Sequence, residues 1–139
     1  MRQHQYSVLQ GLVVVSLVIS TATSLRSAGR ALAVIQECAG GVPESPSWSS
    51  TRLWLLRVGY YKLTRAKEQG EDWGWIVDHV GQVGQEKCLL IVGIRLSALP
   101  VAGAYLTHRD VEPIALCPVT QSNGEIVYQQ LEAARKQTG

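Results

Sequence analysis

The chain has 139 residues, of which 46% are hydrophobic and 17% are charged, and this composition excludes a disordered chain and predicts one ordinary domain or two small ones. The formal net charge is +2, but the charges are unevenly distributed. Residues 1–70 hold eight Lys or Arg and three Glu, whereas residues 71–139 hold five Lys or Arg and eight Asp or Glu. A basic half followed by an acidic half suggests an anion-binding module joined to a second module.

The cysteines and histidines indicate neither a disulfide framework nor a zinc site. Cys38, Cys88 and Cys117 cannot all pair, and the sequence contains no C-x-x-C motif. The three histidines are scattered, with no pair at a ligand spacing. Reduced thiols in a cytoplasmic protein are the simplest interpretation of this cysteine pattern.

The first predicted element is an apolar helix over residues 6–20. Its core, "VLQGLVVVSLVIS" at residues 8–20, is shorter than the about 20 residues that a membrane-spanning helix needs, so we expect no membrane partner. With Arg2 as a charged start, the same run fits the apolar part of a signal peptide, and a small exported protein with a cleaved leader is one alternative. Against that alternative, the run continues directly into a second helical pattern without a sharp cleavage signal.

A second helix is predicted from "SLRSAGRALAVIQECAGG", with Ser24 or the preceding threonine as its cap. The segment places apolar residues at spacings of three and four, which is the pattern of an amphipathic helix. Arg26 and Arg30 are four residues apart and share another face. Gly40 and Gly41 end the helix, and the loop "VPESPS" follows.

The third predicted helix is "STRLWLLRVGYYKL", which Ser47 or Ser49 can cap. Leu53, Leu56 and Tyr60 line one side of it. Three short helices, with the last two joined by a loop, are consistent with a helix-turn-helix unit. The polar segment "TRAKEQGED" follows, so we place a domain boundary between residues 1–70 and 71–139.

Past residue 72 the pattern becomes that of strands. Residues 73–80 and 87–96 are predicted to form an antiparallel pair, joined by the turn "GQVGQE". Residues 110–119 form a third strand, which its two prolines place at an edge of the sheet.

A last helix is predicted from about Gly124 to Lys136, with Asn123 as its cap. This helix covers one face of the sheet, and we expect the other face to lack a cover within this chain. The predicted fold class is α+β, with a three-helix unit followed by three antiparallel strands and one helix.

Asp78 stands in the middle of the first predicted strand, among Trp, Ile and Val residues that favour a packed sheet. An unpaired carboxylate in a buried strand is costly. The position therefore predicts a site where solvent or a metal ion meets the carboxylate, unless the segment is not a strand. A structural aspartate that accepts hydrogen bonds from the hairpin is a further alternative.

The order of these elements resembles the front of a DDE transposase, in which a helix-turn-helix module precedes a ribonuclease H-like catalytic domain. The phrases that carry the resemblance are "SLRSAGRAL", "PSWSSTRLWLLRVGYYKL", "WGWIVDHVGQVGQEKCLLIVGIRL" and "DVEPIALCPVTQSNGEIVYQQLEAA". They are similar to a group of bacterial insertion-sequence transposases, over roughly residues 4–139.

The resemblance implies that Asp78 is the first acidic residue of a catalytic triad and a ligand of Mg²⁺ or Mn²⁺. The family's second Asp and its Glu have no counterpart before Gly139. A single carboxylate cannot place two metal ions about 4 Å apart, so the chain is expected to be inactive alone. The implied partners are the missing C-terminal half of the enzyme, or a second copy of the chain through self-association. Asp110 and Glu112 are the only nearby alternatives, at the entrance of the third strand.

Double-stranded DNA is the expected ligand of the basic half. The candidate contacts are the Lys and Arg residues of the second and third helices and of the linker, namely Arg26, Arg30, Arg52, Arg57, Lys62 and Arg65. Of these, the third-helix residues Arg52 and Arg57 are the first choices. The rival interpretation is a DNA-binding regulator, in which the same helices bind DNA and the strands mediate association.

Overall fold

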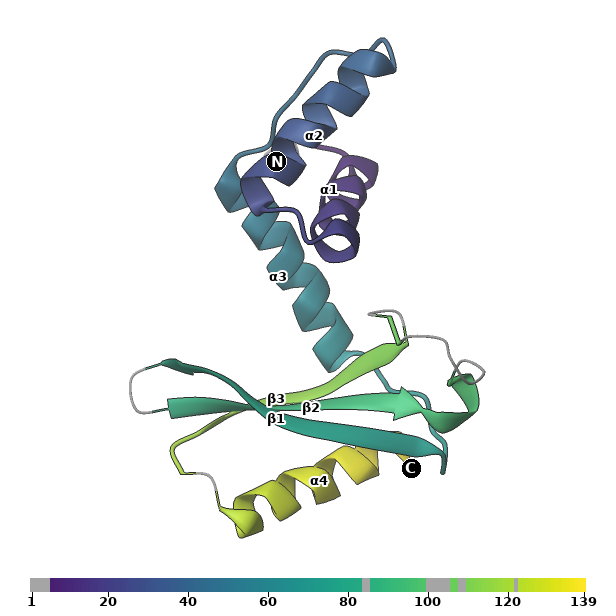
Figure 1. Ribbon diagram of the computed structural model, residues 1–139, viewed down its shortest axis with the longest axis vertical. Helices are drawn as coiled ribbons and strands as arrows, with labels where there is room; N and C mark the ends of the chain where they lie inside the picture. Colours follow the sequence, from purple (N-terminus) through teal and green to yellow (C-terminus); the bar gives the residue numbers. More distant parts are fainter. Residues whose placement is uncertain (1–5, 84–85, 100–105, 108–109, 122) are drawn as a thin grey trace, which may run out of the picture. The chain divides into compact units, whose positions relative to one another are not determined.

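The computed structural model describes residues 6–83, 86–99, 106–107, 110–121 and 123–139. Within them the elements are α1 (Val8–Thr21), α2 (Leu25–Cys38), α3 (Trp48–Thr64), β1 (Trp73–Val83), β2 (Glu86–Arg95), the 3-10 turn η1 (Leu96–Ala98), β3 (Val111–Val119) and α4 (Gly124–Thr138) (Figure 1). This order confirms the predicted α+β layout of helices followed by an antiparallel sheet and a last helix.

The chain forms two compact units, Met1–Tyr60 and Tyr61–Gly139, which we call unit 1 and unit 2. Unit 1 holds α1, α2 and most of α3, and unit 2 holds the sheet and α4. The division falls inside α3, whereas the boundary predicted from the polar segment lies after residue 70.

Polar side chains cap the helices where the sequence predicts caps. The side-chain oxygens of Ser24, Ser47 and Asn123 each accept a hydrogen bond from the backbone amide three residues further on, at 3.2, 3.1 and 2.9 Å. The first turn of a helix leaves its amides without intrahelical partners, so each cap satisfies one of them. At the start of α1, Ser7 and Gln10 form a capping box.

Unit 1 has a small apolar core between α1 and α2. Val14, Ala28 and Leu32 are buried in one cluster, and Trp54 of α3 packs against it. Tyr6 meets the Trp54 ring edge-on, with ring centroids 5.4 Å apart. Among the described residues, no helix is both long and apolar enough to cross a membrane.

The sheet of unit 2 has the order β1-β2-β3, and both pairs of strands are antiparallel. The β1–β2 ladder runs from Trp73 opposite Arg95 to Val83 opposite Glu86, so the turn is shorter than predicted. The register shifts at Gly81, whose φ is 68°. Glycine takes this left-handed conformation without strain, so Gly81 serves as the extra residue of a bulge and the pairing continues beyond it.

The edge position predicted for β3 is confirmed. Proline has no amide hydrogen, so Pro113 and Pro118 are compatible with a strand that pairs on one side only. A register shift leaves Ile114 as an extra residue between Pro113 and Ala115, and both Ile114 and Ala115 contact the core.

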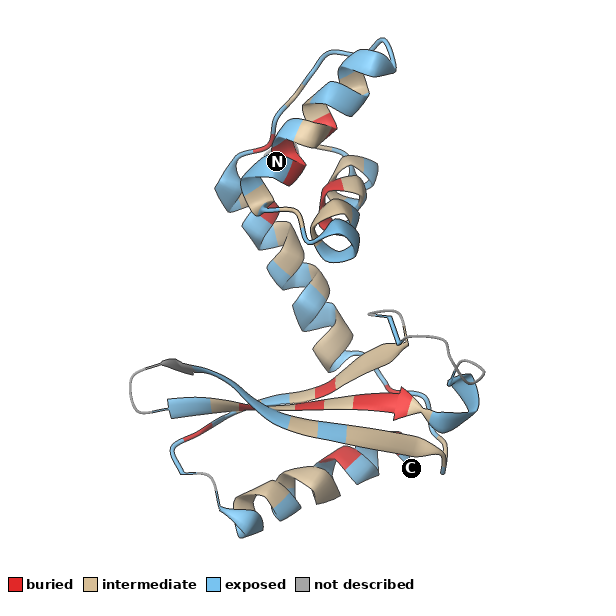
Figure 2. Ribbon diagram, in the orientation of Figure 1, coloured by how far each residue is buried: buried red, intermediate tan, exposed pale blue. Residues whose placement is uncertain are grey.

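Helix α4 covers one face of the sheet (Figure 1). Ile91, Ile114 and Ala134 are buried there, and the partly buried side chains packed against them are Trp73, Trp75, Val77, Ala115 and Leu131. Side chains alternate along a strand, so the residues of β1 between these lie on the opposite face. That face carries exposed apolar residues, including Ile76, Val80 and Leu116. Figure 2 colours the exposed stretches of the strands pale blue.

Candidate metal ligand and nucleic-acid interface

Asp78 lies on β1 opposite Leu90, on the sheet face away from α4. It is exposed and the strand itself is present, so the carboxylate meets solvent, which is one of the predicted alternatives. Its Oδ1 accepts a hydrogen bond from the backbone amide of His79, at 2.7 Å. The apolar neighbours that suggested burial are divided between the two faces, and among the described elements α4 packs against the face opposite Asp78. The carboxylate therefore meets solvent without a large desolvation cost.

Asp78 can provide one ligand to a divalent cation, but its surroundings do not complete a site. Among the described residues, no group of three or more His, Cys, Asp or Glu side chains could hold a metal ion. Its nearest neighbours on the same face are apolar, with Ile76 and Val80 on β1 and Leu90 across the ladder. An exposed carboxylate fits the preference of Mg²⁺ for oxygen ligands, so the residues present fit one ligand of such an ion and no more.

The alternative carboxylates, Asp110 and Glu112, are engaged in local structure. One Asp110 oxygen accepts hydrogen bonds from both the amide and the hydroxyl of Thr107, each at 2.7 Å. Glu112 is held by Arg65 and Lys67. Neither carboxylate is brought together with Asp78 in a group that could hold a metal ion.

Four of the predicted DNA contacts lie in unit 1 and share two features, exposure and the lack of an ion pair in the described part of the chain. Arg26 and Arg30 on α2 and Arg52 and Arg57 on α3 are all exposed. The ion pairs found in the described part of the chain all lie in unit 2, so none of these four arginines has a carboxylate partner there. The Arg52 guanidinium lies over the Trp48 ring, 5.7 Å from its centroid, which holds the charge without cancelling it.

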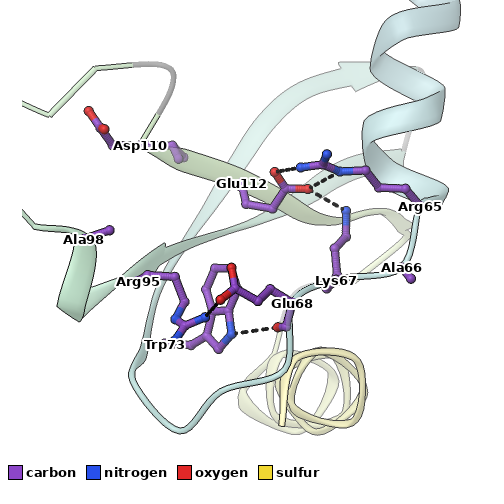
Figure 3. A pocket seen from close by; sticks show the side chains of 10 residues that line it. Arg65, Ala66, Lys67, Glu68, Trp73, Arg95, Ala98, Asp110 and Glu112 are labelled. Atoms are coloured by element: carbon purple, nitrogen blue, oxygen red, sulfur yellow. Dashed lines mark hydrogen bonds and ion pairs between the residues drawn. The ribbon is translucent and has the colours of Figure 1, made fainter.

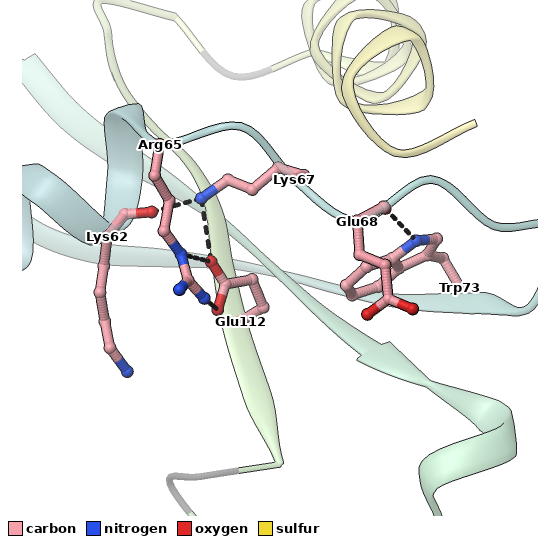
Figure 4. Close-up of polar contacts among 6 residues, drawn as sticks. All are labelled: Lys62, Arg65, Lys67, Glu68, Trp73 and Glu112. Carbon is pink, nitrogen blue, oxygen red and sulfur yellow. Dashed lines mark hydrogen bonds and ion pairs between the residues drawn. The ribbon is translucent and has the colours of Figure 1, made fainter.

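The remaining predicted contacts, Lys62 and Arg65, lie in unit 2. Arg65 donates two hydrogen bonds to the carboxylate of Glu112, from Nε at 3.1 Å and from Nη2 at 2.6 Å (Figure 4). Lys67, whose side chain is 1% exposed, donates to Glu112 Oε1 at 3.1 Å and also to the backbone oxygen of Lys62. The Arg65 and Lys67 charges are thus partly compensated, unlike those of the unit 1 arginines.

The contacts of this cluster shift the pKa values of Glu112 and Arg65. Burial alone would raise the pKa of Glu112, but the hydrogen bonds from Arg65 and Lys67 outweigh burial, and the pKa lies below its usual value. The hydrogen bond to Glu112 raises the pKa of Arg65. The ion pairs from Arg65 and Lys67 to Glu112 hold the end of α3 and the following segment to β3.

A second charged group, which the sequence analysis did not predict, is centred on Arg95. Its guanidinium bonds Asp72 Oδ1 at 2.5 Å, lies 2.5 Å from Glu68 Oε1, and stacks over the Trp73 ring at 5.4 Å. The two groups line a cavity of about 400 Å³ in unit 2 (Figure 3). Among the described residues that line it, the cations Arg65, Lys67 and Arg95 are each paired with a carboxylate, so they offer no uncompensated positive charge to a ligand.

The pKa of Asp72 in this second group is lowered. Hydrogen bonds from Ser97, followed by those from Arg95, lower the pKa of Asp72 to about 2. The sequence provided little indication of the contact between Asp72 and Arg95. The two residues become neighbours only through the strand register that places Trp73 opposite Arg95.

Comparison with known protein families, with curated proteins and with solved structures found no match for the chain. The resemblance to transposases therefore rests on the quoted sequence phrases and on the order of the elements. Any function built on it is a proposal.

Proposed function

We propose that the chain is the front part of a DDE transposase, with unit 1 as its double-stranded DNA-binding region and Asp78 as the first acidic ligand of its metal site. The parent activity is cleavage and transfer of DNA strands that depends on Mg²⁺ or Mn²⁺. The observation that carries the DNA-binding part is the set of exposed arginines on α2 and α3 without carboxylate partners in the described part of the chain.

Uncompensated arginines support DNA binding because phosphate contacts depend on charge that the protein does not already neutralise. Each phosphate neutralised releases counterions, which makes the affinity strongly dependent on salt. We expect non-specific binding with Kd of about 10⁻⁴ to 10⁻⁶ M at physiological salt. Double-stranded DNA as the ligand is consistent with the cytoplasmic location that we expect from the cysteine pattern.

The catalytic part of the proposal is supported by the position of Asp78. The carboxylate is exposed in the middle of β1, in a sheet with α4 on its other face. When bound, a divalent metal pair supplies an activated attacking oxygen and stabilises the leaving oxygen. Asp78 would hold and orient one such ion together with further carboxylates, because the described residues contain no group of three potential ligands. The missing C-terminal half of the enzyme is the proposed source, and the exposed sheet face is where it, or a second copy, would associate.

A DNA-binding regulator is the second candidate. It is favoured by the absence, among the described residues, of any group of three potential metal ligands. Both candidates require DNA binding, and they differ in whether Asp78 has a chemical role.

The experiment that separates the two candidates joins the chain, after Gly139, to the second half of a ribonuclease H-like catalytic domain that carries an Asp and a Glu. The chain alone should show no Mg²⁺-dependent cleavage of a DNA duplex, and the fusion should show it. Asp78→Asn keeps the side-chain shape but removes the charge that binds Mg²⁺, so it should return the fusion to background. A fusion that cleaves equally well with the Asp78→Asn substitution would remove the catalytic role and leave the regulator.

A further inference from the structure

Helix α3 has one side that packs against the unit 1 core and another side that carries exposed large apolar residues. Thr51 is the fully buried residue of α3, and Trp54 beside it packs into the unit 1 core. On the opposite side Leu53, Leu56 and Tyr60 are 46%, 52% and 71% exposed. An exposed stripe of large apolar side chains is the usual mark of an interaction surface. We call these three residues the α3 stripe.

The α3 stripe has the spacing of a helix-pairing seam. Leu53, Leu56 and Tyr60 are separated by three and four residues, which corresponds to positions a, d and a of a heptad. In that register Arg52 is at the preceding g position and Arg57 is at e, so one arginine flanks each side of the stripe. No acidic residue is present anywhere in Trp48–Thr64, and neither arginine has a carboxylate partner in the described part of the chain.

The flanking charges decide which helix fits. In a pair formed with a second copy, the e and g positions of the two helices meet, so Arg52 and Arg57 would face arginines and repel them. A helix with apolar a and d positions and Glu or Asp at e and g meets the same stripe with opposite charges on both sides. Charge complementarity thus selects an acidic partner over a second copy.

We propose that the α3 stripe is a docking site for an acidic amphipathic helix of a partner protein. The partner helix buries its apolar seam against Leu53, Leu56 and Tyr60 and places carboxylates beside Arg52 and Arg57. This function goes beyond DNA binding, and it shares two arginines with the proposed DNA surface. The acidic helix and DNA therefore compete for unit 1, whereas Arg26 and Arg30 on α2 serve DNA only.

The test uses two synthetic peptides of about four heptads, with Leu at a and d and with either Glu or Lys at every e and g position. Like charges at e and g keep each peptide from pairing with itself. A titration of the full chain, followed by fluorescence anisotropy of the labelled peptide, should show binding of the Glu peptide and at least tenfold weaker binding of the Lys peptide. The double variant Arg52→Glu/Arg57→Glu should invert this preference, an outcome that loss of fold cannot produce.

Two further variants locate the surface. Leu56→Gln should weaken the Glu peptide about tenfold, and the matched control Val34→Gln, which changes an exposed apolar residue of α2, should leave it unchanged. Arg26→Ala/Arg30→Ala should weaken DNA binding and leave the affinity for the Glu peptide unchanged. The experiment therefore distinguishes a failure of the docking proposal from a failure of the DNA-binding proposal. Equal binding of both peptides, no binding of either, or self-association of the chain that Leu56→Gln abolishes would overturn the proposal.

Discussion

The two units carry their positive charge in opposite ways. Residues 1–60 hold five Arg and two Glu, and the arginines of α2 and α3 have no ion pair in the described part of the chain. Residues 61–139 hold eight Lys or Arg and nine Asp or Glu, and Arg65, Lys67 and Arg95 are each held by carboxylates. The number of cations is therefore a poor guide to anion binding, and what matters is which cations are already compensated.

The largest stability effect is expected where a compensated charge is buried. Glu112→Gln keeps the size of the side chain but leaves Lys67, whose side chain is 1% exposed, without its countercharge. Breaking a buried pair from one side costs several kcal/mol, so we expect a loss of roughly 3 kcal/mol in the free energy of unfolding.

Urea unfolding measures this loss, and two matched variants sharpen the comparison. Arg65 is 42% exposed, so Arg65→Ala should cost about 1 kcal/mol or less. In unit 1, Arg52→Ala should change stability by about 0.5 kcal/mol or less, because no carboxylate of the described chain pairs with it. Equal losses for Glu112→Gln and Arg52→Ala would mean that the two units do not differ as described.

A smaller effect is expected from pH. The folded-state pKa of Asp72, about 2, lies below the usual value of 3.8, so folding favours the ionised form. Its contribution to stability is complete above about pH 4 and is lost as the pH falls toward 2. The difference in melting temperature between the wild type and Asp72→Asn should therefore shrink over this interval. A difference that is constant between pH 6 and pH 2 would exclude the ionised Asp72–Arg95 contact.

The smallest effect is expected at Asp78. Its carboxylate is exposed, so Asp78→Asn in the chain as it stands should change the free energy of unfolding by about 0.5 kcal/mol or less. Thermal unfolding measures this directly. A loss well above that range would identify Asp78 as a structural hydrogen-bonding residue and would remove the main support for a catalytic role.

Local patterns were sufficient to predict most of the elements. Ser24, Ser47 and Asn123 mark helix starts because a cap acts within three residues, and prolines mark an edge strand because each lacks an amide hydrogen. The sequence left the alternatives for Asp78 open, because strand alternation assigns the residue to a face without telling which face α4 covers.

The charged groups of unit 2 were not predictable for a related reason. Arg65 and Lys67 meet Glu112 across 47 and 45 residues of sequence, and Asp72 meets Arg95 only through the strand register. From the sequence, Arg65 was grouped with Arg52 and Arg57 as a candidate DNA contact. The fold gives Arg65 a carboxylate partner, Glu112. Compensation is a property of tertiary structure and does not appear in composition.

The measurement that tests the central claim removes two positive charges from each unit in turn and compares DNA binding. Arg26→Ala/Arg30→Ala changes two arginines of unit 1 that have no ion pair in the described part of the chain, and Arg135→Ala/Lys136→Ala changes two exposed cations of unit 2. Fluorescence anisotropy of a labelled duplex, repeated over a range of salt, gives the slope of log K against log salt. If each unit 1 arginine contacts one phosphate, the unit 1 variant should lose about two units of slope, and the unit 2 variant should match the wild type. Equal losses in both variants would show that binding follows net charge alone and would contradict a DNA-binding surface on unit 1.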